Sequence, residues 1–334
     1  MTETGKYIYG IIPNKDNSIQ DNGVYTIPYQ DIAAVVSDSE VIDYTNLLKD
    51  ALARYLLRHQ QVIENIMENF TIIPMRLGTY CADEDEVRHI LARGYCRIKD
   101  IFKEIDGKIE IDVVAIWNIF DDVLKEIAEE EEIKEFKQSL LNKKEGVTVD
   151  EQVRIGVLIK GYLDKKREKY SHRIESSLKG ISHDYRTHIP MNDKMVINSA
   201  FMIEKSRQKD FGKTIEDLDN EFAEKLNFRC VGPLPPYSFR TLEVKKMRFD
   251  EISLAKKKLD LGDTATKEDI EKAYRRMAQV YHPDRNQMQS DSQEQFDELN
   301  RAYKMLLEYC QDKVCSFKEE EFVRNAIIVK EMAK

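Results

Sequence analysis

Long apolar runs, proline and glycine are scarce in this sequence, and each scarcity excludes a class of protein. No apolar stretch approaches the roughly 20 residues that cross a bilayer, and the N-terminus lacks a basic segment followed by an apolar one. Only 8 prolines and 13 glycines occur among 334 residues, while 42% of the residues are apolar, so a fibrous or disordered chain is excluded. We therefore expect a folded, helix-rich protein of several domains that stays in the cytoplasm.

Cysteine and histidine are also too few, and too scattered, to indicate a metal site or a disulfide framework. The 5 cysteines are an odd number and contain no C-x-x-C pair. Among the 6 histidines, those at positions 172, 183 and 188 lie near one another without the spacing of metal ligands. We expect the cysteines to be reduced and mostly buried.

Enzyme motifs are missing as well. The chain has no Gly-rich phosphate loop, no G-x-S-x-G and no H-E-x-x-H. Arg76, beside Gly78, is a candidate anion-binding residue, but we favour a pairing with a local carboxylate at a strand end. The run from Glu129 to Glu132 indicates a solvated helix face, because consecutive helical residues point in different directions. We therefore expect that the protein is not an enzyme and holds no cofactor and no metal.

The clearest pattern present is a pair of amphipathic helices around Tyr281-His282-Pro283-Asp284-Arg285-Asn286. Before this stretch, apolar residues recur at helical spacing, namely Ile270, Ala273, Tyr274, Met277, Ala278 and Tyr281. Thr266 is placed to cap the start of this helix together with Asp269. Pro283 cannot continue the helix, and a second apolar stripe runs from Phe296 to Cys310. The pattern predicts a helical hairpin with His-Pro-Asp at its tip.

Three basic residues lie on the opposite side of the first helix: Lys272, Arg275 and Arg276. On a chain of net charge -9, such a patch attracts an acidic partner. Nucleic acid is the other candidate for a basic helix face, but the face is short and no arginine-rich segment follows. We therefore expect no nucleic-acid binding.

Residues 249–312 resemble the J domain of the DnaJ family. The resemblance is carried by Leu259-Asp260-Leu261-Gly262, Ala273-Tyr274-Arg275-Arg276-Met277-Ala278, Tyr281-His282-Pro283-Asp284-Arg285-Asn286 and Asn300-Arg301-Ala302-Tyr303. J domains bind a DnaK-type ATPase and stimulate its ATP hydrolysis. The resemblance implies that the chaperone-binding residues are His282, Pro283 and Asp284 in the loop, with Lys272, Arg275 and Arg276 as the electrostatic contact.

The preceding part of the chain interleaves β-prone and helical segments. Strands are expected at 6–13, 24–29, 32–37, 71–80, 109–119 and 195–203, and helices at 45–69, 84–104, 121–141, 148–178 and 211–226. A proline-rich segment at 228–239 closes this part of the chain. This order predicts α+β architecture, with helices on one face of a mixed sheet.

Three motifs in this part resemble the GvpF/GvpL family of gas vesicle proteins, over about residues 1–241. They are Lys6-Tyr7-Ile8-Tyr9-Gly10, Ile73-Pro74-Met75-Arg76-Leu77-Gly78-Thr79 and Gly232-Pro233-Leu234-Pro235-Pro236-Tyr237-Ser238-Phe239. The resemblance implies two ferredoxin-like α+β domains. It also implies an accessory role in gas vesicle formation, in contact with the small hydrophobic shell protein.

Together the resemblances predict four parts. These are an N-terminal α+β domain (1–119), a second α+β domain with long helices (120–247), an all-α helical-hairpin J domain (248–312) and a C-terminal tail (313–334). Because the tail contains an apolar run at 326–329, we expect it to dock on the α+β domains. They imply a cytoplasmic protein, associated with gas vesicles, whose partners are the shell protein, other gas vesicle proteins and a DnaK-type chaperone. The alternative is a general J-type co-chaperone with broad clients. The absence of a Gly/Phe-rich linker and of a cysteine-rich module favours the dedicated role.

Overall fold

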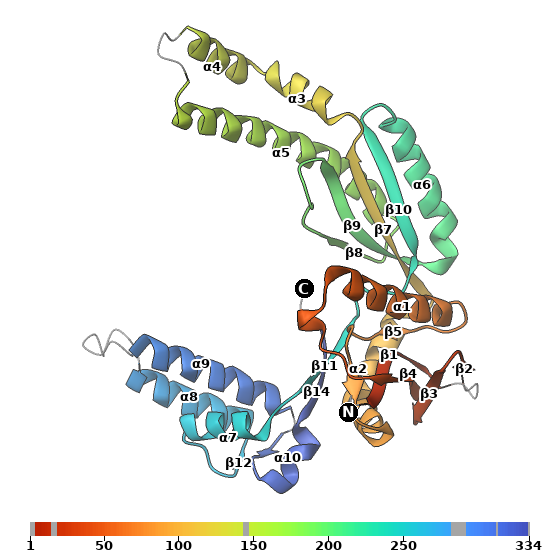
Figure 1. Cartoon of the computed structure of the whole chain (residues 1–334), viewed down its shortest axis with the longest axis vertical. Coiled ribbons are helices and arrows are strands. Elements are labelled where there is room, and N and C mark those ends of the chain that lie inside the picture. The colour runs from red at the N-terminus through yellow and green to blue at the C-terminus, as the bar shows by residue number, and fades with distance from the viewer. Residues whose placement is uncertain (1–3, 15–18, 143–146, 282–291, 312, 333–334) are drawn as a thin grey trace. The chain divides into compact units, whose positions relative to one another are not determined.

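A computed structural model describes residues 4–14, 19–142, 147–281, 292–311 and 313–332 (Figure 1). Contacts divide the chain into two compact units, one of Met1–Phe102 with Thr241–Lys334 and the other of Lys103–Arg240. Strands and helices are interleaved up to residue 241, and helices dominate beyond it. The predicted α+β class with a helical C-terminal part is therefore confirmed. Among the helices described, none has the length and apolar character needed to cross a bilayer.

The first unit is built on a sheet whose central strand is β1 (Thr4–Pro13). Its strands follow the order β2-β3-β4-β1-β5, and β6 also pairs with β1. The other strands are β2 (Gln20–Asp21), β3 (Val24–Tyr29), β4 (Ile32–Glu40), β5 (Ile73–Pro74) and β6 (Tyr80–Cys81). Helix α1 (Lys49–Met67) follows the first four strands, and α2 (Glu84–Ile105) follows β6. Strand β1 is buried along most of its length, because it is paired on both sides.

The single strand predicted at 71–80 is instead two short strands, β5 and β6. The first ends at Pro74, although the N–H of the following Met75 still donates to the Tyr9 carbonyl at 2.9 Å. Gly78 then adopts a φ of +84°, a conformation that side chains with a Cβ rarely adopt, and an added Cβ there would lie 3.0 Å from the ring of Tyr44. The chain therefore turns between the two strands.

The second unit has the β-α-β-β-α-β order of a ferredoxin-like fold. It contains β7 (Lys108–Trp117), α3 (Phe120–Ala128), α4 (Glu131–Leu141), α5 (Val149–Lys179), β8 (Asp184–Thr187), β9 (Met195–Glu204), α6 (Gln208–Glu221) and β10 (Leu226–Leu234). The strands form an antiparallel sheet in the order β10-β7-β9-β8. Helix α5 contacts β9, α6 contacts β10, and the two helices contact each other, so both cover the same face of this sheet.

The helix predicted at 121–141 is divided into α3 and α4. Ile127 and Ile133 are both buried. On a continuous helix, two residues six positions apart would point about 120° away from each other, and the break lets α4 turn Ile133 toward the buried side as well. The acidic residues Glu129 to Glu132 occupy this break or flank it, and all are exposed as predicted.

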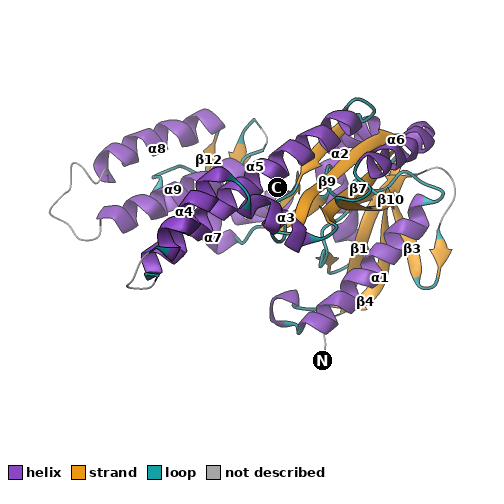
Figure 2. Cartoon of the chain, turned by 90° about the horizontal axis from the view of Figure 1, so that it is seen from above, coloured by secondary structure: helices purple, strands orange, loops and turns teal. Residues whose placement is uncertain are grey.

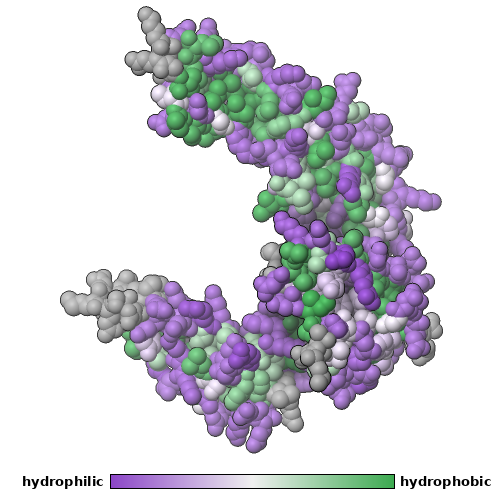
Figure 3. All heavy atoms as spheres, viewed as in Figure 1, coloured by the Kyte–Doolittle hydropathy of each residue, from purple (hydrophilic) through white to green (hydrophobic). Residues whose placement is uncertain are grey.

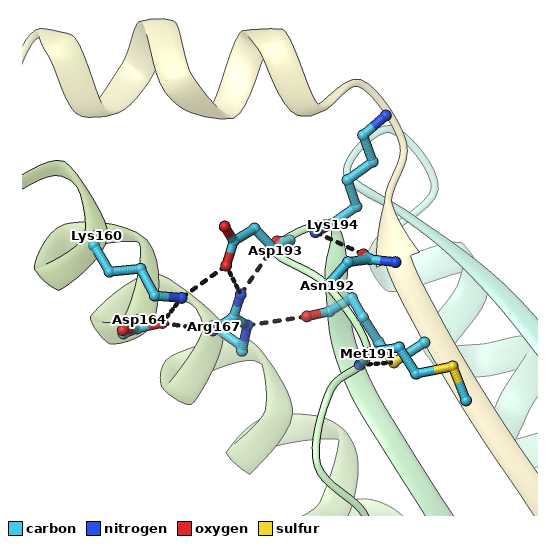
Figure 4. Close-up of polar contacts among 8 residues, drawn as sticks. Lys160, Asp164, Arg167, Met191, Asn192, Asp193 and Lys194 are labelled. Atoms are coloured by element: carbon cyan, nitrogen blue, oxygen red, sulfur yellow. Dashed lines mark hydrogen bonds and ion pairs between the residues drawn. The ribbon is translucent and has the colours of Figure 1, made fainter. Parts of the chain in front are cut away.

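Helix α5 is fixed at its start and along its length by polar contacts. Thr148 and Glu151 form a capping box at its first turn. Further along, Lys160 and Arg167 reach Asp193, before β9: the Lys160 ammonium lies 2.7 Å from the carboxylate, and Arg167 donates to the Asp193 carbonyl (Figure 4). The hydrogen bond from Lys160 holds the pKa of Asp193 below its usual range. These contacts fix the loop before β9 against the helix.

Large apolar side chains remain exposed on the helical layer of the second unit, where apolar surface gathers along α4 and α5 (Figure 3). They include Leu141, Val149, Val153 and Val157, with exposed fractions of 60% or more. The three valines follow one another at intervals of four on α5, so they form one stripe.

Candidate functional site

The candidate site lies on a group of three helices in the first unit: α7 (Phe249–Lys258), α8 (Lys267–Tyr281) and α9 (Ser292–Tyr309). Helices α8 and α9 run side by side (Figures 1 and 2), and α7 packs against α9. Tyr274 of α8 stacks on Tyr303 of α9 with ring centroids 4.1 Å apart, and its hydroxyl donates to the Asn300 side chain at 2.6 Å. The predicted helical hairpin is therefore confirmed.

The start of α8 is held by Thr266 and Asp269, as the sequence predicts. The Asp269 N–H donates to the Thr266 hydroxyl oxygen at 3.1 Å, while the Asp269 carboxylate accepts from the Thr266 N–H at 3.0 Å and from its hydroxyl at 2.8 Å. These hydrogen bonds lower the pKa of Asp269, and the bond from the Thr266 backbone N–H has the largest effect. The reciprocal cap satisfies donors at the helix N-terminus and fixes where α8 begins.

The structure places Lys272, Arg275 and Arg276 together on one exposed face of α8. The apolar side of the helix contributes Ile270 and Ala273 to the buried core shared with α7 and α9. The three basic side chains therefore point away from that core and are accessible to a partner. The other predicted site residues, His282 to Asp284, follow directly after α8 and lie outside the described residues.

The two arginines differ in their local partners. Arg275 faces Glu271 one turn earlier at 3.4 Å, an exposed pair that contributes little to stability. Arg276 donates to the Asp260 carboxylate at 3.1 Å, in the turn between α7 and α8, where Asp260 has a φ of +53°. Arg275 is thus the better probe of binding, because replacing Arg276 also removes a contact to that turn.

A strand from the C-terminal tail attaches this helical group to the N-terminal sheet region. Strand β14 (Ile327–Glu331) pairs antiparallel with β11 (Leu242–Lys246), and Leu242 accepts a hydrogen bond from the Arg76 N–H at 2.8 Å. Val329 of β14 packs so closely on α2 that a Cβ added to Gly94 would lie 3.0 Å from it. The tail therefore contacts both α2 and β11.

Charged side chains reinforce this attachment. Lys330 of β14 lies 2.7 Å from Glu308 of α9 and 3.3 Å from Glu243 of β11, and Lys245 also pairs with Glu308. Burial opposes ionisation of Glu308, yet the hydrogen bonds from both lysines hold its pKa below its usual value. Arg76 pairs with Glu243 at 2.8 Å, so its partner is a carboxylate as expected, but one that lies 167 residues further along the sequence.

The expectation that all cysteines are reduced is wrong for one pair. Cys310 and Cys315 form a disulfide with Cα atoms 5.2 Å apart, and both residues are buried. Strand β13 (Cys315–Ser316) pairs with β12 (Thr264–Ala265), and this pairing places Cys315 where it meets Cys310 at the end of α9. Their spacing matches no familiar motif, so the sequence carried no signal for it.

A buried histidine that sequence reasoning did not single out joins two of the family motifs. The Tyr7 hydroxyl donates to Nδ1 of His59 at 2.7 Å, and Nε2 donates to the Met75 carbonyl at 3.1 Å. Burial lowers the pKa of His59 to about 4, so the ring is neutral at pH 7. Both ring nitrogens are engaged within the fold, which indicates a structural role.

The third motif has a comparable structural partner. Glu110, buried near the start of β7, accepts a hydrogen bond from the Ser238 N–H at 2.7 Å. Gly232 has a φ of +152°, and a Cβ there would lie 2.9 Å from the Glu110 carbonyl oxygen. The motif residues therefore hold the fold together. Within the described ranges, no group of three His, Cys, Asp or Glu side chains is arranged to hold a metal ion.

A helical hairpin with a basic outer face is the arrangement expected of a J domain. Here it is attached to an α+β protein through the pairing of β14 with β11. The DnaJ domain family matches residues 257–311. The chain belongs to the gas vesicle synthesis protein GvpL/GvpF family, which matches residues 5–241. Both resemblances drawn from the sequence are confirmed.

Individual relatives agree with this division. The chain is similar to gas vesicle protein F of Microcystis aeruginosa, with 25% identity over 249 residues that cover 71% of this chain and 98% of that protein. It is also similar to the crystal structure of GvpF from Anabaena sp., with a TM-score of 0.60, 25% identity and the same two coverages. Over 48 residues it is 50% identical to the chaperone protein DnaJ of Prosthecochloris aestuarii, covering 14% of this chain and 12% of that one.

Proposed function

We propose that this protein is a gas vesicle assembly factor that binds the hydrophobic shell protein and recruits a DnaK-type chaperone, whose ATPase it stimulates. The observation that carries this proposal is that one chain joins a GvpL/GvpF region to a J domain. A tether of this kind raises the effective concentration of a held protein near the chaperone. The protein would act in the cytoplasm, in association with gas vesicles.

Two surfaces support the two halves of this proposal. The exposed face of Lys272, Arg275 and Arg276 suits an acidic docking surface on the chaperone. The exposed valine stripe of α5 and Leu141 suit an apolar partner such as a shell subunit, since clustered apolar side chains mark interaction sites.

Replacing Arg275 by Glu is expected to weaken binding of the DnaK-type chaperone about tenfold at low salt. The exchange converts attraction into repulsion at an exposed position while leaving the core of α8 intact. The loss should shrink as ionic strength rises, because exposed charges are screened. Titration of the chaperone by surface plasmon resonance at several salt concentrations measures both effects.

The matched control is Lys304→Glu, which makes the same change of charge at an exposed position on α9. It should leave binding nearly unchanged. Equal losses for both variants would show that only net charge matters, and the assignment of the α8 face would then be wrong.

The shell-protein half is tested with the full chain. Tagged protein is expected to co-precipitate the shell protein from the same cell and not to suppress aggregation of unrelated unfolded proteins. The His282→Gln variant should retain the shell protein, since its change lies in the chaperone-binding loop. Broad suppression of aggregation without capture of the shell protein would support the alternative, a general J-type co-chaperone.

A further inference from the structure

A groove in the first unit lies beside the start of α2 and is open to solvent. Its volume is about 500 Å³, within the range of pockets that hold ligands or peptide side chains. Its apolar lining comes from Met247, after β11, and from the C-terminal tail, which supplies Phe322, Ala326 and Ile327. Ala82, just before α2, completes this apolar part.

The rim of the groove is acidic. Three carboxylates line it, those of Asp83, Asp85 and Glu86, against the single ammonium group of Lys246, which pairs with Glu86 at 2.7 Å. Helix α10 (Glu319–Asn325), which supplies Phe322, begins with three exposed glutamates. These glutamates lie within about one helical turn of Phe322, closer than the screening length of about 8 Å at physiological salt. Among the charged side chains that line the groove itself, the three carboxylates outnumber the one ammonium group.

The carboxylates are held in place by the start of α2. The Glu86 N–H donates to the Asp83 carboxylate at 2.9 Å, and the Glu86 carboxylate accepts from the Ala82 N–H at 2.6 Å. Asp85 pairs with Arg88 at 3.0 Å but has a side chain that is 94% exposed. The rim is therefore preorganised, while the Asp85 carboxylate remains accessible.

We propose that this groove binds a peptide segment in which apolar side chains are flanked by lysine or arginine. The apolar floor accepts the central side chains, and the acidic rim pairs with the flanking cations. A second copy of this chain, with its net charge of -9, suits the acidic rim less well than a strongly basic partner does. We therefore assign the groove to a basic segment of a different protein, and the proposal does not depend on the action of the J domain on an ATPase.

The test uses the full chain and a fluorescent synthetic peptide with leucine and phenylalanine at its centre and lysines at both ends. Fluorescence anisotropy is expected to show saturable binding that weakens as salt is added. The same peptide with glutamates in place of lysines should bind at least about tenfold more weakly. Equal binding of both peptides would overturn the proposal.

Variants locate the binding. Ala82→Trp fills the groove from an exposed position without removing a side-chain contact, and is expected to weaken binding about tenfold. Ala53→Trp, at an exposed position of α1, is the matched control and should bind normally. The Asp85→Lys variant should bind the lysine peptide more weakly and the glutamate peptide more tightly. Unchanged affinity in Ala82→Trp would place the peptide elsewhere and refute the assignment. Because no ATPase is present, the proposed chaperone function can fail without altering these results.

Discussion

The His282→Gln variant is expected to lose stimulation of the DnaK-type ATPase entirely, with hydrolysis falling to the basal rate of the chaperone alone. His282 belongs to the loop that the J-domain resemblance assigns to the chaperone, and it follows directly after α8. Glutamine keeps a polar side chain but cannot reproduce both the shape and the hydrogen bonding of the imidazole ring. Steady-state ATP hydrolysis by the chaperone, with increasing amounts of each variant, measures the effect.

The fold of the variant should be unchanged. The packing of the described helices depends on side chains such as Ile270, Leu299 and Tyr309, all buried away from the chain ends that flank the loop. Circular dichroism and the midpoint of thermal unfolding should therefore match those of the parent chain. Full stimulation by a folded His282→Gln protein would contradict the assignment of this loop, and a loss of structure would make the ATPase result uninformative. The Arg275→Glu and His282→Gln variants together separate docking from stimulation.

Much of the J domain was predictable from sequence because its determinants are local. The cap formed by Thr266 and Asp269 and the apolar side of α8 depend on residues only a few positions apart, so spacing alone indicates them. The basic face follows from the same periodicity. The gas vesicle motifs were recognisable in the sequence, but the residues that they contact were not.

Those partners come from distant parts of the chain. His59 joins Tyr7 to Met75, and Glu110 of β7 holds Ser238, more than a hundred residues further on. No periodicity relates such positions, because they meet only after the sheets have formed. The Cys310–Cys315 disulfide was missed because it depends on the pairing of β13 with β12. The break between α3 and α4 was missed because it depends on which side chains the rest of the unit buries.

The pairing of β14 with β11 has the largest consequence for stability. A chain that ends at Ala326 lacks β14 and should be about 5 kcal/mol or more less stable to denaturant, since each fully buried Ile or Val contributes about 1.5–3 kcal/mol. Ile327, Ile328 and Val329 are all buried, and Ile328 belongs to the same core as α7, α8 and α9. Hydrogen exchange should show lost protection of β11 amides that are paired with β14.

A chain that ends at Met332 is the matched control, because it removes only two residues and leaves β14 intact. It should unfold like the parent. The Gly94→Leu variant tests the same contact from the opposite side, since its larger side chain would collide with Val329 and displace the strand from α2. If shortening to Ala326 left both the unfolding midpoint and the β11 protection unchanged, β14 would contribute nothing to the unit. The J domain would then be attached through the chain connection before α7 alone, and the contacts of Lys330 and Val329 would be incidental.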